Sequence, residues 1–309
     1  MVTKINKEQL DFLDDLLLSA RKSVNSKLLH FDDKGSPISE PIDKEIYLKI
    51  KTHLLKCAPP MLYRYRPGNA WNIENIKNGN IWLSTLSEFN DPFECKIYID
   101  FEKIANDLIQ LHPDILMLMK TNHIDQNHPI YKNYINESKE NGKKLIEELA
   151  IKRNRAFVAS FSENKNSLLM WAHYANSHKG FCVGYDFRDI INMFGINIFP
   201  VSYSDEYLTI SSLKKFCDHH DVFLKSIKNT SVEWAYEKEW RLFGKYKINE
   251  PYEKGMITEM IKPQTIYLGA KIDNNIKQQL IEICKIKKIN LYQMQLSDKR
   301  YGLLSYRIL

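Results

Sequence analysis

The sequence lacks the short motifs that mark the common nucleotide-binding and hydrolytic folds. It contains no GxGxxG after a strand pattern, no GxxxxGK[ST], no HExxH and no GxSxG. These motifs supply, in that order, a dinucleotide-binding turn, a phosphate-binding loop, a zinc site and a nucleophilic serine. Their absence argues against Rossmann, P-loop, zincin and α/β-hydrolase chemistry.

Cysteine pairs and metal-ligand spacings are also missing. The chain has five cysteines, an odd number, and none forms a CxxC pair. His173 and His178 are five residues apart and His219 adjoins His220, which is not the spacing of a metal site. We therefore expect reduced thiols in a cytoplasmic protein, with neither a disulfide framework nor a metal site.

No apolar run approaches the roughly 18 residues that a membrane span requires. The first 20 residues, MVTKINKEQLDFLDDLLLSA, show no signal-peptide pattern. Both observations predict a cytoplasmic protein without a membrane partner.

The charge balance permits a polyanionic partner without requiring one. The net charge is +6, and residues 208–309 hold 18 Lys and Arg against 11 Asp and Glu. A basic region that also contains aromatic residues suits RNA or DNA through phosphate attraction and base stacking. The alternative is that these lysines are only solvated surface charges.

Two amphipathic patterns open the chain, over 7–22 and 43–57, and Pro59-Pro60 ends the second. We expect residues 1–58 to form a helical lead-in. It either packs against the main domain or contacts a partner.

Residues 59–309 are expected to form one α+β domain. Strand patterns and helix patterns mix without strict alternation, which favours a mixed or split β-sheet core over a doubly wound fold. A polar, helix-like stretch at about 101–155 is predicted to be a helical insertion. The core strands are expected at 62–66, 81–85, 156–160, 181–185, 234–243 and 265–269.

Three polar clusters lie on or beside these predicted strands: Tyr63-Arg64-Tyr65, Ser160 with Ser162, and Glu237 with Glu239 and Arg241. Charged residues are rarely buried without partners, so the three clusters are candidates for one shared cleft. The structural alternative is that Arg64 pairs with Glu239 while the serines cap a turn.

A further loop carries Asn90, Asp91 and Glu94 around Pro92. Asn and Asp side chains before proline favour a turn that bonds its own backbone. We predict such a turn beside the cleft, with a structural role as the preferred interpretation. A metal-dependent nuclease that uses Asp91, Glu94 and His173 is one alternative function.

Several segments in the same order resemble bacterial domain-of-unknown-function family 2971. They are NGNIWLSTLSEFNDPFE, FVASFSENKNSLLMWAHYANSHKGFCVGYDF, EWAYEKEWRLF and the closing TIYLGAKI. The resemblance covers about residues 62–296, apart from the insertion. The family name implies no activity.

The segment LYRYRPGNAWNIENIKNGNIWLS also resembles the opening of ADP-ribosyltransferase-like domains. In that superfamily one strand carries His or Arg, a second Ser-Thr-Ser or Tyr, and a later one Glu, often as Glu-x-Glu. The corresponding positions here are Arg64, Ser160-Phe161-Ser162 and Glu237-Lys238-Glu239. Phe161 departs from the Thr of the motif, and Arg64 stands where nucleic-acid-directed members often have His.

This second resemblance implies an enzyme that cleaves NAD and transfers ADP-ribose to a macromolecule. Glu239 would stabilise the oxocarbenium-like ribose, while Glu237 would orient the acceptor. NAD would be held by Arg64, by Ser160 or Ser162, and by stacking on Tyr65, Trp171 or Tyr174.

The resemblance does not specify which macromolecule accepts ADP-ribose, and RNA and DNA are candidates. A bacterial toxin or antiphage effector, with a possible antitoxin partner, follows by analogy. The competing class is a non-catalytic module that binds nucleic acid or protein.

Overall fold

The computed structural model describes residues 12, 44–111, 117, 121, 127–217, 219–246 and 253–309. Over these residues the protein is α+β with a mixed sheet, as the sequence predicts. The helix predicted over 7–22 lies outside the described residues, except for Phe12. The chain divides into two compact units, which are described separately.

The first unit comprises 1–85, 156–201 and 233–309, and it contains the main sheet. Ten strands form this sheet: β1 (Met61–Arg66), β2 (Asn80–Thr85), β4 (Ala156–Ser162), β5 (Phe181–Asp186), β6 (Ile198–Pro200), β10 (Glu239–Tyr246), β11 (Gly255–Glu259), β12 (Thr265–Leu268), β13 (Asn290–Leu296) and β14 (Leu303–Arg307). All six predicted core strands contribute to it.

The strand order is β11-β2-β4-β1-β5-β12-β13-β14, with β10 between β4 and β6. Within the described strands of this sheet, β12 and β13 pair in parallel and the other pairs are antiparallel. One edge of β4 pairs with β10. The other edge pairs with β2 at Phe157 and Val158, but with β1 at Ser162. The sheet therefore forks at β4, where β1 and β2 diverge.

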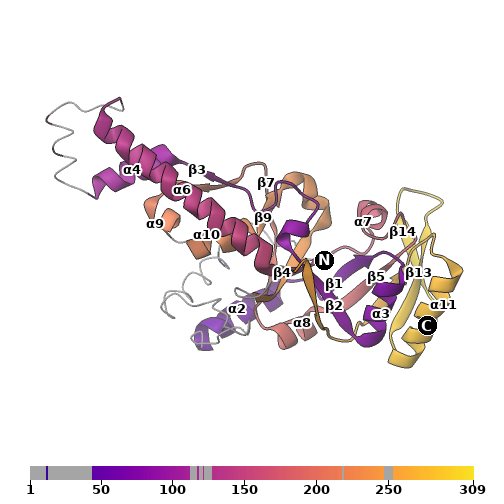
Figure 1. Cartoon of the computed structure of the whole chain (residues 1–309). Helices are drawn as coiled ribbons and strands as arrows, with labels where there is room; N and C mark the ends of the chain where they lie inside the picture. The colour runs from indigo at the N-terminus through magenta and orange to yellow at the C-terminus, as the bar shows by residue number, and fades with distance from the viewer. Residues whose placement is uncertain are drawn as a thin grey trace. The chain divides into compact units, whose positions relative to one another are not determined.

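Helices cover one face of this sheet. They are α2 (Lys44–Cys57), α3 (Ala70–Asn78), α8 (Phe187–Phe194) and α11 (Asn274–Lys287). Their apolar residues, such as Leu54, Ile73, Ile190 and Leu280, join the main core cluster with inward-facing strand residues. Figure 1 shows α11 beside β13 and β14. Burial of this apolar face supplies the main driving force for folding.

The opposite face carries a smaller core. The short helix α7 (Leu168–His173) covers it, and its Met170 and Trp171 pack with Tyr65, Cys182 and other residues of the strands. Ser167 caps α7 by accepting a hydrogen bond from the Met170 amide. This second face is rich in tyrosine, and it holds the candidate site described below.

The second unit comprises 86–155 and 202–232. Its elements are η1 (Leu86–Glu88), β3 (Ile97–Ile99), α4 (Phe101–Gln110), α6 (Pro129–Arg155), β7 (Ser202–Ser204), β8 (Leu208–Ile210), α9 (Leu213–Cys217), α10 (His219–Ser226) and β9 (Asn229–Ser231). The two helices α4 and α6 lie within the predicted helical insertion. They pack closely, because a Cβ at Gly142 of α6 would meet the Phe101 ring at 2.4 Å.

One element boundary differs from the sequence prediction. The strand expected over 234–243 begins only at Glu239, because residues 232–237 form the 3-10 helix η2 (Val232–Glu237). Lys238 between them has φ of 46°, a left-handed conformation that no strand contains.

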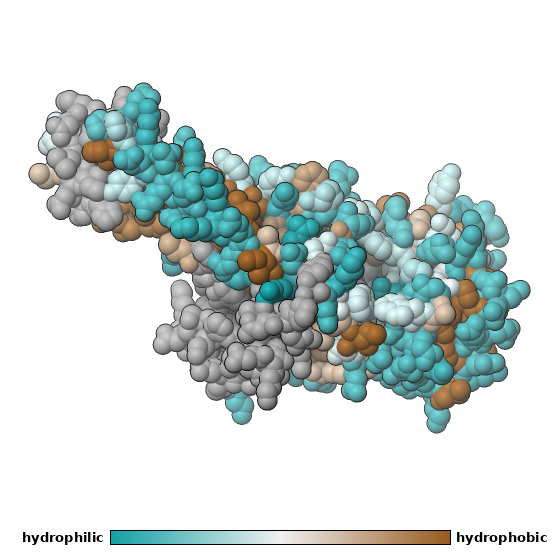
Figure 2. Space-filling model, viewed as in Figure 1, coloured by the Kyte–Doolittle hydropathy of each residue, from teal (hydrophilic) through white to brown (hydrophobic). Residues whose placement is uncertain are grey.

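On the face shown in Figure 2, polar side chains cover most of the surface around α11, and apolar side chains form small patches between them. Large exposed apolar residues of α11 and β14 include Ile286, Leu304 and Tyr306. Within the described part of the chain, no helix combines the length and apolar character needed to cross a membrane.

Gly180 provides a test of the junction between α7 and β5. A Cβ there would lie 2.1 Å from the Arg66 carbonyl oxygen and 3.0 Å from that of Ala175, and backbone atoms cannot rotate away. We expect Gly180→Ala to lower the free energy of unfolding by about 2–3 kcal/mol, the scale of an overpacked core. Urea unfolding measures this change.

Gly302→Ala is the matched control, because nothing lies within 4 Å of a Cβ at Gly302. Its unfolding free energy should stay within about 0.5 kcal/mol of the wild type. Equal stability of the two variants would contradict the packing described for Gly180.

Candidate functional site

The pairing of β10 with β4 brings the predicted hydroxyl and acidic clusters together. Glu239 lies opposite Ser162, and Arg241 lies opposite Ser160. Directly paired residues share one face of a sheet. These four side chains therefore lie on the tyrosine-rich face, at the end of β4 where the sheet forks.

Glu237 joins this group through the turn at Lys238. The Ser162 hydroxyl donates a hydrogen bond to the main-chain oxygen of Glu237. Ser162 Oγ also accepts a hydrogen bond from the Asn164 amide at 3.1 Å. Ser162 thus caps the turn after β4, as the structural alternative predicts, while also fixing the backbone of the first glutamate.

The carboxyl group of Glu237 is buried and held by two tyrosines. Tyr174 Oη donates to Glu237 Oε1 at 2.7 Å, and Tyr236 also bonds this carboxyl. Burial raises the pKa of Glu237 to about 7, although the Tyr174 hydrogen bond opposes the shift. The side chain therefore exchanges a proton near neutral pH, as a general acid or base must.

Glu239 has a different environment. Arg241 Nη2 donates to Glu239 Oε2 at 2.9 Å, and both side chains are buried. This ion pair fixes the orientation of the Glu239 carboxylate. The two carboxyl groups, two residues apart, therefore have different environments: one is paired with an arginine and the other is hydrogen-bonded to tyrosines.

Aromatic side chains surround these groups on the same face. Tyr267 stacks on Tyr292 with ring centroids 5.0 Å apart, and Tyr63 contacts Tyr267 edge to face. Lys165 Nζ lies 5.1 Å from the centroid of the Tyr267 ring. Partial burial lowers the pKa of Lys165. Lys165, Arg241 and several tyrosine hydroxyls thus share the face with the two glutamates.

Arg64 does not join this group. Alternation along β1 places Tyr63 and Tyr65 on the tyrosine-rich face and Arg64 on the other, where its guanidinium lies 5.7 Å from the Phe161 ring centroid. Arg64 Nη2 donates to the main-chain oxygen of Trp82 across the fork between β1 and β2. The alternative pairing of Arg64 with Glu239 is not formed either, since Glu239 pairs with Arg241.

The predicted stacking residues differ in accessibility. Trp171 is fully buried and donates its indole N–H to the Lys165 carbonyl oxygen. Tyr65 is 4% exposed and contacts Trp171 edge to face. Tyr174 is partly exposed, while His173 at the end of α7 is exposed. Of the three predicted stacking residues, Tyr174 alone has a partly open ring and also contacts Glu237.

Asn90, Asp91 and Glu94 belong to the second unit. Asp91 Oδ1 accepts a hydrogen bond from the Phe93 amide at 2.8 Å, which confirms the predicted self-bonded turn. Asp91 Oδ2 accepts from Thr230 Oγ1 at 3.3 Å. Asn90 is exposed and Glu94 is buried. The contacts of Asp91 are those of a structural turn.

Among the residues that the structure describes, no group of three or more His, Cys, Asp or Glu side chains is placed to hold a metal ion. The nuclease alternative therefore has no assembled metal site in that part of the chain.

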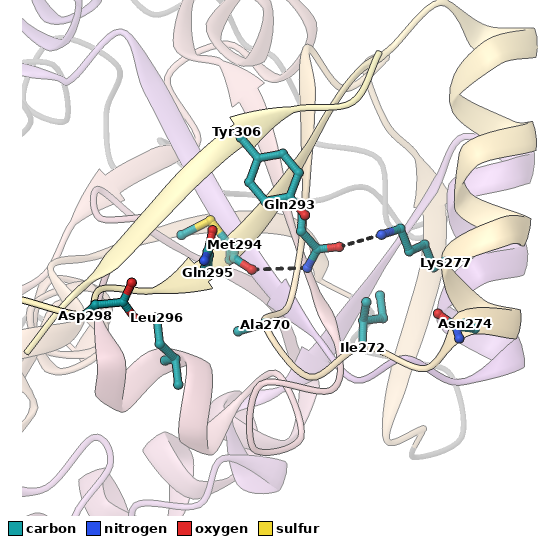
Figure 3. A pocket seen from close by; sticks show the side chains of 10 residues that line it. All are labelled: Ala270, Ile272, Asn274, Lys277, Gln293, Met294, Gln295, Leu296, Asp298 and Tyr306. Atoms are coloured by element: carbon teal, nitrogen blue, oxygen red, sulfur yellow. Dashed lines mark hydrogen bonds between the residues drawn. The ribbon is translucent and has the colours of Figure 1, made fainter.

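The first unit also contains a hollow between α11 and β13. It has a volume of about 470 Å³ and is lined by residues that include Lys277, Gln293 and Asp298. Figure 3 shows Lys277 Nζ donating to Gln293 Oε1 at 3.1 Å and Gln293 Nε2 donating to the Met294 carbonyl oxygen at 3.1 Å. The charged Lys277 side chain in this hollow is thus hydrogen-bonded to the neutral side-chain amide of Gln293.

Sequence reasoning missed Lys165, Tyr236 and Tyr267. Lys165 occurs in a polar loop, and Tyr236 falls in the stretch predicted to be a strand, which is a 3-10 helix here. The abundance of tyrosine, 17 residues, was the one available signal. Which tyrosines meet depends on the strand register, which the sequence does not contain.

Residues 170–242 match a family model described as "Protein of unknown function (DUF2971)". The match supports the resemblance to that family. The matched range includes Tyr174, Glu237, Glu239 and Arg241. Neither the curated proteins nor the solved structures gave a match to the chain. The resemblance to ADP-ribosyltransferase-like domains remains a prediction.

The raised pKa of Glu237 predicts a pH-dependent stability. The folded-state value of about 7 exceeds the ordinary value of 4.5, so the folded state holds a proton that the unfolded state releases. Its contribution is complete below pH 4.5 and is lost as the pH rises through 7. The loss should reach about 3 kcal/mol at most.

Urea unfolding between pH 5 and pH 8 measures this loss, with Glu237→Gln as the comparison that removes the titration. Tyr174→Phe removes a hydrogen bond that lowers the pKa of Glu237, and should shift the midpoint of the loss to higher pH. Parallel curves for the wild type and Glu237→Gln would show that Glu237 does not titrate in this range.

Proposed function

We propose that this protein is an ADP-ribosyltransferase-like enzyme that cleaves NAD at the nicotinamide bond and transfers ADP-ribose to a macromolecule. One observation carries the proposal: Glu237, Glu239 and Ser162 meet at the end of β4, on a face rich in tyrosine. These are the positions at which the sequence resembles the Glu-x-Glu and Ser-x-Ser features of such enzymes.

Glu239 is assigned to the cleavage step. Departure of nicotinamide builds positive charge on the ribose, as in glycoside cleavage. An ionised carboxylate fixed beforehand stabilises that charge without reorganisation. Arg241 acts as a positioning residue, because its ion pair with Glu239 holds the carboxylate in place.

Glu237 is assigned to the acceptor. A carboxyl group with a pKa of about 7 can accept a proton from an attacking hydroxyl or amino group near neutral pH. The proton passes from the acceptor to Glu237 as the new bond to the ribose carbon forms. Tyr174 orients the carboxyl through its hydrogen bond to Oε1.

Binding of NAD is assigned to other groups of the tyrosine-rich face. Lys165 supplies a positive charge for the pyrophosphate, and the partly exposed Tyr63 and Tyr174 supply ring surface for a base. Arg64 receives no role in this site, because it lies on the opposite face. Nucleic acid is the proposed acceptor, on the basis of the basic surplus in residues 208–309.

Replacing Glu239 tests the assignment directly. Glu239→Gln keeps the shape of the side chain and removes its charge, so the rate of nicotinamide release should fall about 100-fold or more. The dissociation constant for NAD should change much less, since the contact strengthens mainly in the transition state. A chromatographic assay of released nicotinamide measures the rate.

Glu282→Gln on the exposed surface of α11 is the matched control and should retain the wild-type rate. Thermal melts of each variant are required, because Glu239→Gln leaves Arg241 buried without its ion-pair partner. A folded Glu239→Gln protein with wild-type nicotinamide release would refute the assignment.

A further inference from the structure

Two arginines on β1 face a small cavity on the helix-covered side of the main sheet. Arg64 and Arg66 are two residues apart, so they project from the same face of the strand. The cavity lies between these arginines, β2 and the start of α3, and its lining includes Trp71, Asn72 and Trp82. Its volume is about 20 Å³.

Both guanidinium groups carry hydrogen-bond donors without acceptors. Arg64 is only 7% exposed, and its Nη2 donates to the Trp82 carbonyl oxygen. Arg64 Nη1 and Arg66 Nη2 are buried with no hydrogen-bond partner. Buried donors are almost always paired in folded proteins, and a charged donor costs most when it is not.

The charge of this cavity is also uncompensated. None of the described residues that line it is acidic. Burial lowers the pKa of Arg66 to about 10, so this side chain is still cationic at neutral pH. A water molecule would satisfy a donor but would leave two like charges together in a desolvated site. An anion would satisfy both the donors and the charge.

We infer that the cavity formed by Arg64, Arg66 and the start of α3 binds an oxyanion, the anionic oxygen of a phosphoryl or carboxylate group. Guanidinium forks match both groups, which share this chemistry. A cavity of about 20 Å³ admits one water-sized group. Only the end of a ligand therefore enters, and the rest would lie against Trp71, which lines the cavity and is 46% exposed.

This oxyanion site lies on the opposite face of the sheet from Glu237 and Glu239. It can therefore be tested in the absence of NAD. It also gives Arg64 a ligand-binding role that the tyrosine-rich face does not.

Thermal unfolding of the full chain tests the inference. Chloride is exchanged stepwise for inorganic phosphate or for acetate at constant ionic strength, and the variants Arg66→Gln and Arg300→Gln are compared with the wild type. Arg300 is exposed in the loop before β14 and serves as the matched control. The apparent Kd for the oxyanion comes from the dependence of Tm on its concentration.

We expect phosphate, acetate or both to raise the Tm of the wild type and of Arg300→Gln along the same saturable curve. In Arg66→Gln the apparent Kd should increase about tenfold or more, which corresponds to about 1.4 kcal/mol. Without an oxyanion, Arg66→Gln should melt no lower than the wild type, because it removes a guanidinium whose Nη2 is buried without a hydrogen-bond partner. The more effective anion identifies the group as phosphoryl or carboxylate.

Equal Tm shifts in the wild type and in Arg66→Gln would overturn the inference, because they would arise from general salt effects. No shift in the wild type with either anion would overturn it as well. If Arg66→Gln does not fold, Arg64→Lys takes its place. That variant keeps the charge but loses the guanidinium fork, and should weaken oxyanion binding in the same way.

Discussion

The candidate site depends on the pairing of β10 along one edge of β4. This pairing sets Glu239 opposite Ser162 and Arg241 opposite Ser160, so residues 77 and 81 positions apart in the sequence become neighbours. The left-handed Lys238 then turns the chain so that Glu237 returns to the same end of β4. A slip of one residue in this register would move Glu239 to the opposite face, among the apolar side chains of the main core.

The fork at β4 divides the buried charges between two environments. On the tyrosine-rich face, carboxyl groups are buried with tyrosine hydroxyls, an arginine and a lysine nearby. On the helix-covered face, Arg64 is buried and Arg66 is half-buried, and none of the described residues that line their cavity is acidic. Because β1 and β2 diverge there, Arg64 can reach the Trp82 carbonyl oxygen across the gap. Because side chains alternate along β1, this strand contributes Tyr63 and Tyr65 to one face of the sheet and Arg64 and Arg66 to the other.

Much of the fold follows from local sequence patterns. The six core strands were predicted because short apolar or alternating runs are bounded by turn residues, as in Asn78-Gly79 before β2. The strand start near residue 234 was wrong because alternation of Trp234, Tyr236 and charged residues imitates a half-buried strand, although the backbone there is a 3-10 helix. Strand β14 has no strong pattern, since four of its five residues are exposed.

The candidate site was only partly accessible to sequence reasoning. The serine and glutamate clusters were correctly predicted to be neighbours. Each cluster lies on or beside a predicted core strand, and those two strands, β4 and β10, pair in the sheet. Which side chains of two different strands share one face of the sheet depends on how the strands are paired. No local sequence pattern specifies this pairing register. Alternation alone does show that Arg64 and Tyr65 point to opposite faces of β1, so they could not both serve one site.

The central claim is that the face containing Glu237 and Glu239 acts on NAD. The most direct measurement is a time course of nicotinamide release from NAD by the purified wild-type protein, with and without RNA or DNA. The account predicts release that is proportional to protein concentration and is accelerated by a nucleic-acid acceptor that gains ADP-ribose. If the folded protein neither binds NAD nor releases nicotinamide with any acceptor, the claim is contradicted, and a non-catalytic binding role becomes the better account.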